Sequence, residues 1–311
     1  MSLEHGGSPN YFSRLKAIWG KAAGQSFYEY GNWDSAWVED EVLEFAHRGK
    51  KGPQRLRMVD LQQCVKDLVY GLQPALEKLL PGGMELPSSQ AHHFVGNIYP
   101  EETFFVDSQI SMDIMAPLYK AFKDGHNTTT ASLPSAVAWL KNEKGFLGHL
   151  LATLLISGGV SPRTTSAQAC RIRGLGRNIF HAQGSTIWIS SRPKVNSATC
   201  SSNGLWAFPS QVAWPLYFYL GVVRPFSAYL LESIGHKPDS DILRDYLFVY
   251  TSTSTSQYTQ KLWARRDTKQ VIAEYFADPL DLNMDCFDLR QILQAVANRQ
   301  LVNLNGSIHF D

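Results

Sequence analysis

The uncharged stretch LWAFPSQVAWPLYFYLGVV, residues 205–223, decides between a membrane protein and a protein with a buried core. Its 19 residues are long enough to span a bilayer. Two prolines, Pro209 and Pro215, interrupt the apolar run, and most of its bulk is aromatic rather than aliphatic. A helix that begins near Pro209, with Ser210 and Gln211 exposed in its first turn, would be buried without any lipid. We therefore expect a core helix here, with a membrane-associated protein as the weaker alternative.

This stretch lies inside a block of 88 residues, from Lys144 to Leu231, that contains no Asp or Glu. The block carries eight Lys or Arg residues, so the net charge of +1 leaves −7 on the other 223 residues. Arginine forks match phosphate oxygens, and a basic surface without carboxylates attracts a polyanion such as nucleic acid. Burial of apolar segments would also make charges scarce. We favour an anion-binding surface, because burial explains the missing acids but not the remaining cations.

The composition indicates a folded protein without a cofactor or a metal site. The chain has 311 residues, of which 44% are hydrophobic and 12% aromatic, enough for the cores of two domains. No pair of cysteines has CxxC spacing, which argues against zinc and against disulfides and favours a reducing compartment; they are Cys64, Cys170, Cys200 and Cys286. The pair His92-His93 has no further ligand at metal-binding spacing. The first twenty residues lack the order of a secretory signal, so we expect a nuclear or cytoplasmic protein.

Local patterns predict a mainly α protein with a small β-sheet, an α+β fold in two domains. We expect residues 1–10 to be disordered and residues 11–125 to form a helical N-terminal domain. Its expected helices cover 11–21, 34–47 and 59–80, the last with one apolar stripe. A tract of small polar residues, 126–134, is typical of a linker. Residues 135–311 would form the second domain.

The second domain is expected to be helical around one hairpin. Asn178–Ala182 and Ser185–Ser190 flank Gln183-Gly184 and predict a β-hairpin, with Ile187 and Ile189 on one face. Pro162-Arg163 would open a helix after the glycines that end the preceding one. The other expected helices cover 134–141, 146–156, 209–222, 226–234, 239–249, 255–276 and 286–302.

Four segments of this half, in this order, resemble a known family. They are ISGGVSPRTT (156–165), NIFHAQGSTIWIS (178–190), AFPSQVAWPLYFYLGVVRPF (207–226) and FDLRQILQAVANRQL (287–301). Together they resemble fungal Crypton-type tyrosine-recombinase-like domains, which occur within or beside telomere-linked RecQ-helicase-like proteins. The resemblance covers about 144–302. It implies a mostly helical α/β domain of DNA recombination and integration that follows an all-helical domain, with which it clasps duplex DNA in the nucleus.

The resemblance also implies a phosphate-binding site. The first catalytic arginine matches Arg163, a lysine beside the hairpin matches Lys194 approximately, and the arginine of a His-x-x-Arg motif matches Arg290. Two arginines brought together by folding would clamp one phosphate through bidentate forks.

The match to the family is incomplete. Ser166 stands where an acid is expected, Phe287 replaces the histidine of His-x-x-Arg, and Gln291 follows the second arginine. No tyrosine follows Tyr275, and the chain ends 21 residues after Arg290, before the expected nucleophile. Strand exchange needs that nucleophile and a general base. We therefore expect a degenerate domain that binds duplex DNA without cutting it, unless a neighbouring protomer donates a tyrosine.

Other cations would add contacts to the DNA backbone. We assign this role to Arg171, Arg173, Arg177 and Arg192, and to a row on one side of the expected 255–276 helix, namely Lys261, Arg265, Arg266 and Lys269. A further basic patch is a nuclear-import signal, a DNA-following arm or a solvated loop; it comprises Arg48, Lys50, Lys51, Arg55 and Arg57. The expected partners are duplex DNA, a second copy of the chain on DNA, and a helicase encoded alongside; a membrane is not expected.

A protein-interaction or structural remnant without DNA binding is the alternative from another class. In that case the basic block would pack against the acidic N-terminal half, for instance against Asp34, Glu39, Asp40, Glu41 and Glu44.

Overall fold

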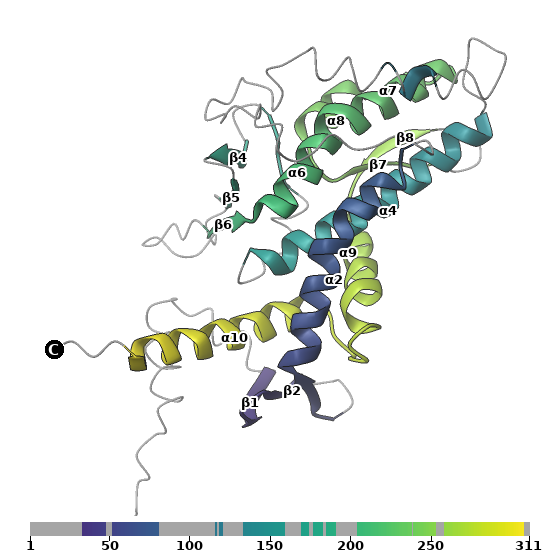
Figure 1. The fold of residues 1–311 in the computed structure, drawn as a ribbon. Coiled ribbons are helices and arrows are strands. Elements are labelled where there is room, and N and C mark those ends of the chain that lie inside the picture. Colours follow the sequence, from purple (N-terminus) through teal and green to yellow (C-terminus); the bar gives the residue numbers. More distant parts are fainter. Residues whose placement is uncertain are drawn as a thin grey trace, which may run out of the picture.

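The chain adopts an α+β fold in which long helices accompany three small antiparallel sheets (Figure 1). The computed structural model describes residues 33–47, 52–80, 116, 118–120, 133–158, 169–173, 177–182, 185–190, 204–237, 239–252 and 258–307. The expected disordered N-terminus, the expected helix 11–21 and the expected linker 126–134 lie outside these residues.

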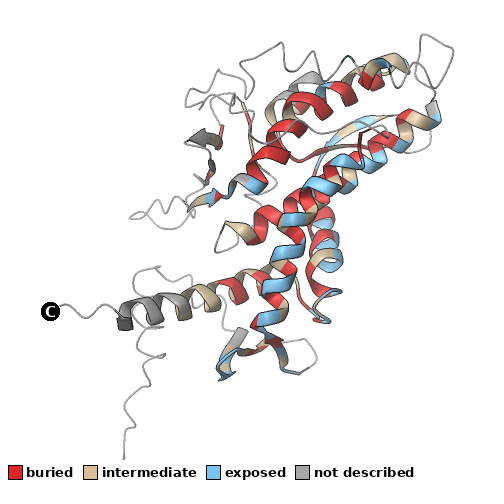
Figure 2. Ribbon diagram, viewed as in Figure 1, coloured by how far each residue is buried: buried red, intermediate tan, exposed pale blue. Residues whose placement is uncertain are grey.

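Helices α2 (Met58–Glu77) and α4 (Leu133–Ser157) lie side by side at the centre of the fold (Figure 1). The apolar stripe predicted for α2 is confirmed, since its leucines are buried while its opposite side faces solvent (Figure 2). Polar contacts join the two helices: Nε2 of His149 lies 2.8 Å from the carbonyl oxygen of Leu68, and the Thr153 hydroxyl donates to the same oxygen at 3.3 Å. Packing of α4 on α2 is therefore specific as well as hydrophobic.

Residues 33–47 form a β-hairpin, so the helix predicted for 34–47 is wrong. Strands β1 (Trp33–Glu39) and β2 (Val42–His47) pair antiparallel across a two-residue turn at 40–41. Along β2 only every second side chain, Leu43 and Phe45, is fully buried. This period of two is that of a strand with one face on the core, and it overrides the helical spacing read from the sequence.

Part of the expected basic loop is a strand. β3 (Gln54–Arg57) pairs with β2, and its arginines bind acids: Nε of Arg55 lies 2.9 Å from Glu44, and Nε of Arg57 lies 2.7 Å from Asp60. These pairs are exposed, so each contributes at most about 1 kcal/mol to stability. The other three cations of that patch lie outside the described residues.

The predicted hairpin of the second half is confirmed. Strands β4 (Ile179–Ala182) and β5 (Ser185–Ser190) pair across Gln183-Gly184, and β6 (Gly204–Phe208) adds a third antiparallel strand. Ile187 and Ile189 share one face of β5 as predicted. The more deeply buried face is the other one, which carries Thr186 and Trp188.

Helix α4 runs without interruption where two helices were predicted. The expected break at residues 142–145 is absent, because a single glycine costs a helix only about 1 kcal/mol and the flanking turns are buried. Gly145 itself has open space around its Cα.

The uncharged stretch 205–223 becomes strand β6 followed by a helix that starts after Pro209, as predicted, with Gln211 exposed. Helix α6 (Ser210–Phe218), the π-helical turn η2 (Tyr219–Val223) and helix α7 (Arg224–Ser233) form one continuous rod. Pro225 lacks the N–H that would bond the carbonyl of Gly221, and the π turn before it allows the rod to continue. Within the described ranges, every helix is too short or too polar to cross a bilayer.

Two further helix predictions are wrong in part. Helix α8 (Ser240–Asp245) starts at its Asp239 cap as predicted but ends before the strands β7 (Val249–Ser252) and β8 (Thr259–Leu262), which form a two-stranded antiparallel ribbon. The segment predicted as helix 255–276 becomes helical only in α9 (Arg265–Ile272) and the π turn η3 (Ala273–Ala277). Its β-branched and aromatic residues favour strands, because they pack well on a pleated surface.

Helix α10 (Cys286–Ser307) confirms the predicted C-terminal helix and extends it. The core is continuous from β2 to α10, and it joins parts of both predicted domains. For example, the Cys64 thiol of α2 lies 3.4 Å from the carbonyl oxygen of Tyr275. Cys64, Cys170 and Cys286 are free thiols. The division into two domains stays a prediction, since the expected linker is outside the described residues.

Gly158, directly after α4, allows β6 to approach closely. A Cβ atom there would lie 2.7 Å from Cε1 of Phe208 and 3.1 Å from Cβ of Trp206. We expect Gly158→Ala to lower the free energy of unfolding by about 1–3 kcal/mol, because both neighbours would have to move. The measurement is urea unfolding followed by far-UV circular dichroism.

The matched control is Gly145→Ala, inside α4, where nothing lies within 4 Å of the added Cβ. It should raise the free energy of unfolding by up to about 1 kcal/mol. Equal effects of the two substitutions would contradict the close approach of β6.

Candidate nucleic-acid interface

Two of the three residues predicted to form the phosphate site, Arg163 and Lys194, lie outside the described residues, and the third, Arg290, is half-buried on α10. Arg192, which was predicted to contact the DNA backbone, also lies outside the described residues. A phosphate shared by Arg163, Lys194 and Arg290 therefore stays a prediction.

Two arginines predicted to contact DNA are used inside the fold. Arg177 is buried, its Nε donates to the carbonyl oxygen of Ile179 at 2.7 Å, and its guanidinium lies 5.1 Å from the Phe180 ring centre. Nη2 of Arg171 donates to the Tyr246 hydroxyl at 3.1 Å, and the guanidinium lies 4.8 Å from that ring centre. We correct the expectation for Arg177, because a buried guanidinium cannot reach a phosphate. Arg173 is partly exposed and keeps its predicted role.

Arg224 is a third internal arginine, for which no individual role was predicted. It is buried, and Nη1 donates to the carbonyl oxygens of Leu243 at 3.1 Å and Tyr246 at 2.6 Å. Nη2 donates to the carbonyl oxygen of Leu247. The carbonyls that end a helix lack partners within it, and a cation there also interacts favourably with the helix dipole. Arg224 thus fixes the end of α8 and the chain that follows.

A buried carboxyl completes this cluster. The Tyr219 hydroxyl donates to Oε1 of Glu143 at 2.9 Å, and Nη2 of Arg224 donates to the same hydroxyl at 3.2 Å. Burial raises the pKa of Glu143 to about 7, against the opposing effect of the Arg224 charge. Burial likewise raises the pKa of Tyr219, so its hydroxyl stays neutral. The sequence carried a signal for Arg224, which is the one charged residue between Lys194 and Glu232 and so needs partners if its helix is buried. It carried none for Glu143, which stands between Lys141 and Lys144.

Lys144 connects α4 to the β7–β8 ribbon and to α9. Its ammonium lies 3.4 Å from Oδ1 of Asp267 and 4.0 Å from the centre of the Tyr250 ring. Oδ2 of Asp267 accepts the N–H of Ala264 at 2.9 Å, which caps the first turn of α9. Asp267 is buried, so the acid in the first turn of α9 is used internally.

The row of cations predicted on a helix is found on β8 and α9 instead, and all four of its members are exposed. We call this row the cation ridge; it consists of Lys261, Arg265, Arg266 and Lys269. Arg265 and Lys269 are one helical turn apart and share a face of α9. Since Asp267 points into the fold, the ridge carries no carboxylate between its first and last members.

The ridge reaches the beginning of α10. The charges of Arg265 and Lys269 both act on the thiol of Cys286, whose pKa is raised to about 11 mainly by burial and also by Asp285. Cys286 and Arg290 are four residues apart on α10 and therefore lie on the same side of that helix. Arg290 is thereby placed on the side of α10 nearest the cation ridge.

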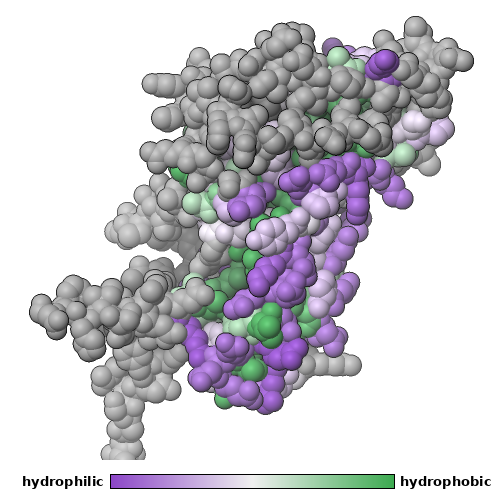
Figure 3. All heavy atoms as spheres, in the orientation of Figure 1, coloured by the Kyte–Doolittle hydropathy of each residue, from purple (hydrophilic) through white to green (hydrophobic). Residues whose placement is uncertain are grey.

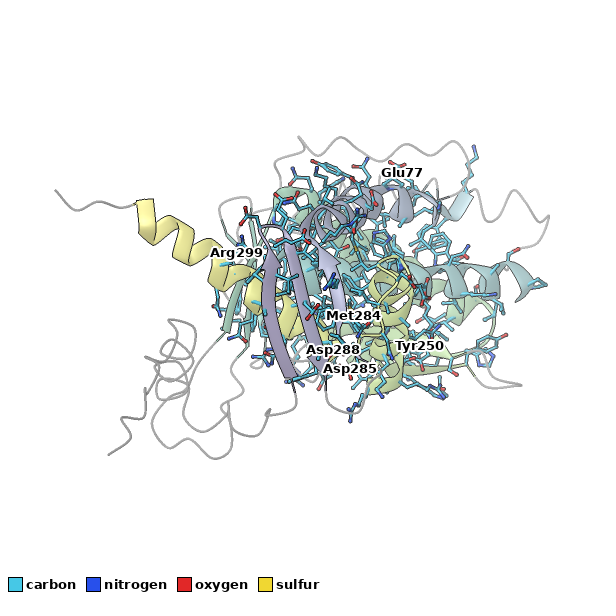
Figure 4. All side chains as sticks on the ribbon, turned by 90° about the horizontal axis from the view of Figure 1, so that it is seen from below. Glu77, Tyr250, Met284, Asp285, Asp288 and Arg299 are labelled. Carbon is cyan, nitrogen blue, oxygen red and sulfur yellow. The ribbon has the colours of Figure 1, made fainter. Side chains whose placement is uncertain are left out.

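Two acids hold the first turn of α10, as Figure 4 shows from below with Arg299 farther along the helix. Oδ1 of Asp285 accepts the N–H of Asp288 at 3.2 Å, and Oδ2 of Asp288 accepts the N–H of Asp285 at 2.9 Å. This reciprocal pair is a capping box. It gives Asp288 a structural role next to Phe287.

Among the described residues, no cluster of His, Cys, Asp and Glu is arranged to hold a metal ion, and His92-His93 lies outside them.

Two of the acids that the alternative would place against the basic block, Glu44 and Asp40, pair with cations outside it. Glu44 binds Arg55 of β3, and Asp40 lies 3.5 Å from Arg299 of α10, whose guanidinium also stacks 4.2 Å from the Trp37 ring centre. Neither cation belongs to residues 144–231.

Hydrophilic side chains dominate the described surface over α2 and the neighbouring end of α4 (Figure 3).

Glu143 should make stability depend on pH. A raised pKa means that the folded state holds a proton that the unfolded state has lost. The contribution of Glu143 to the free energy of unfolding is therefore fully present below about pH 4.5 and is lost as pH rises through about 7. This difference in pKa corresponds to about 3 kcal/mol. Glu143→Gln keeps the acceptor for Tyr219 and cannot ionise. We expect it to exceed the wild type by less than about 1 kcal/mol at pH 5 and by up to about 3 kcal/mol at pH 8 in urea unfolding.

Glu77→Gln, at an exposed glutamate on α2, is the control and should leave the pH dependence unchanged. A Glu143→Gln variant that parallels the wild type from pH 5 to pH 8 would contradict a neutral Glu143.

No protein-family model matches this chain, and neither a characterised protein nor a solved structure is significantly similar to it. The resemblance to Crypton-type recombinase-like domains therefore stays a prediction, and function is inferred from the charges and geometry above.

Proposed function

We propose that this protein binds duplex DNA through the phosphate backbone, with the cation ridge as the main contact. The observation that carries this proposal is the exposure of Lys261, Arg265, Arg266 and Lys269 together with the burial of Asp267, the acid between them. Four exposed cations with no exposed carboxylate between them in the sequence attract a polyanion, and each phosphate contact releases a condensed counterion.

The arrangement of the ridge suits a backbone contact rather than one small anion. Lys261 belongs to a strand, whereas the other three cations lie along the first two turns of α9. The ridge continues toward Arg290 on α10, and Arg173 is partly exposed on a separate segment. A row of separate cations follows successive phosphates, which fixes the protein on the duplex without reading its sequence.

We also propose that binding occurs without strand cleavage, as a degenerate relative of recombinase-like domains would do. Phe287, at the position where the resemblance calls for a histidine, cannot transfer a proton. Its neighbour Asp288 is buried and committed to the cap of α10. Under this proposal the protein acts in the nucleus, and the partners implied by the resemblance are a second copy of the chain on DNA and a helicase encoded alongside.

A structural or protein-interaction role is the second candidate, favoured by the internal use of the basic block. Arg177 and Arg224 are buried, Arg171 binds Tyr246, and Lys144 binds Asp267. The acid-free block is thus partly explained by packing. The ridge is not, because three of its members follow the block by more than thirty residues and all four face solvent.

The test is fluorescence anisotropy of a labelled duplex titrated with protein across a salt series. The ridge variant is Lys261→Gln/Arg265→Gln/Arg266→Gln/Lys269→Gln. Since each phosphate contact contributes about 0.9 to the slope of log affinity against log salt, we expect the slope to become shallower by about three units.

The matched control removes four exposed lysines elsewhere, as Lys66→Gln/Lys78→Gln/Lys120→Gln/Lys237→Gln. It changes the net charge equally and should keep most of the wild-type slope. Equal losses in both variants would show that only net charge matters, and no duplex binding by the wild type at low salt would favour the structural role.

A further inference from the structure

The ribbon formed by β7 and β8 has one face that is mostly buried and one that packs on the core only at Tyr250, which is partly buried. Its cross-strand pairs are Val249 with Leu262, Tyr250 with Lys261, Thr251 with Gln260 and Ser252 with Thr259. Partners in an antiparallel pair point to the same side, and successive pairs alternate. Val249 and Thr251 are buried, and the Gln260 side chain accepts the N–H of Asp239 at 2.9 Å. The face of these residues is the inner one, although Leu262 at its edge is 40% exposed.

The outer face of the ribbon carries Tyr250, Ser252, Thr259 and Lys261. Thr259 and Lys261 are exposed, and Tyr250 and Ser252 are partly exposed. All four side chains bear a hydroxyl or an ammonium, so the face presents hydrogen-bond donors and hydroxyl acceptors without a carboxylate. Its small residues leave room for a partner to approach the strands.

Cations flank this face at its base. The ammonium of Lys144 lies 4.0 Å from the centre of the Tyr250 ring. Burial raises the pKa of Tyr250 and Asp267 raises it further, while the nearby charge of Arg266 acts in the opposite direction. The sequence contains no acid from residue 246 to residue 266. The ribbon and the ridge therefore form one positively charged surface, in which a hydroxyl-bearing strand pair stands beside backbone-binding cations.

We propose that the β7–β8 ribbon enters the major groove of duplex DNA with its outer face toward the base edges, while α9 holds the adjacent phosphates. This inference rests on the proposed DNA binding and adds the element that reads the groove. A major groove about 12 Å wide admits a two-stranded ribbon, whereas the minor groove of about 6 Å does not. Ser and Thr hydroxyls bond to any base, and lysine bonds to guanine O6 and N7.

Stacking of an unpaired base on Tyr250 is less compatible with the contacts of that ring. Lys144 covers it at 4.0 Å, and Trp263 packs against it at 6.2 Å in a perpendicular arrangement. A stacking platform needs an open aromatic face. The groove-binding arrangement needs only the hydroxyl edge of Tyr250 and the short side chains beside it.

The test compares two duplexes of the same sequence, one with ordinary cytosine and one with glucosylated 5-hydroxymethylcytosine. The glucose is uncharged and fills the major groove without changing the phosphates. We expect the wild-type protein to bind the ordinary duplex about tenfold more tightly, because groove contacts typically contribute about 1–3 kcal/mol per base pair. In Ser252→Ala/Thr259→Val, which keeps every charge, the difference should fall below about threefold, with the salt slope unchanged.

The control variant Ser35→Ala/Gln62→Leu, on β1 and α2, should discriminate between the duplexes as the wild type does. Equal affinity of the wild type for both duplexes, with the salt slope intact, would overturn the ribbon proposal and leave backbone binding standing. Tighter binding of the corresponding single strand, weakened by the ribbon variant, would replace it with recognition of unpaired bases. No binding of either duplex at low salt would overturn the proposed function and this inference together.

Discussion

The guanidinium of Arg224 binds three backbone carbonyls at the end of α8, and the position of the β7–β8 ribbon depends on this interaction. Without it, the carbonyls of Leu243 and Tyr246 would be left unbonded in an apolar interior, where each such group costs about 1–3 kcal/mol. The carbonyl of Leu247 would keep only the N–H of Val249. The chain then turns directly into β7. The Tyr219 hydroxyl accepts a hydrogen bond from Arg224 and donates one to Glu143 of α4. A polar cluster inside the core therefore fixes the position at which β7 begins.

The same cluster explains why the basic block was only partly informative. Missing acids in the sequence indicate a cationic region, but composition cannot say which cations are turned inward. Arg177 and Arg224 are buried because carbonyl oxygens of neighbouring segments accept their hydrogen bonds. Those acceptors are brought near by tertiary folding, and no local pattern reveals them. Exposed cations, by contrast, could be recognised at α9, where Arg265, Arg266 and Lys269 recur with helical spacing.

The fold was predictable where one periodicity dominated. The α2 stripe, the hairpin around Gln183-Gly184 and the C-terminal helix all carry a strong local signal, and the structure has all three. Residues 34–47 satisfy a helical and a strand pattern at once, and burial of Leu43 and Phe45 on one face decided for the strand. At 255–276 the change from strand to helix occurs within two residues, Trp263 and Ala264, and the local sequence has no Gly or Pro to mark it. The phosphate site that the resemblance implies stays a prediction, since Arg163 and Lys194 lie outside the described residues.

Asp267 joins the interior of the fold to its charged surface. At the third position of α9 a carboxylate can either bond the exposed arginines beside it or cap the helix and bind a cation from the core side. It does the latter, with Ala264 and Lys144 as partners. Lys144 in turn lies against Tyr250 at the base of the ribbon. An exposed Asp267 would have neutralised part of the ridge, so the cap that starts α9 also keeps its outer side cationic. The interaction that fixes the helix and the one that leaves its charges available to a polyanion are therefore the same.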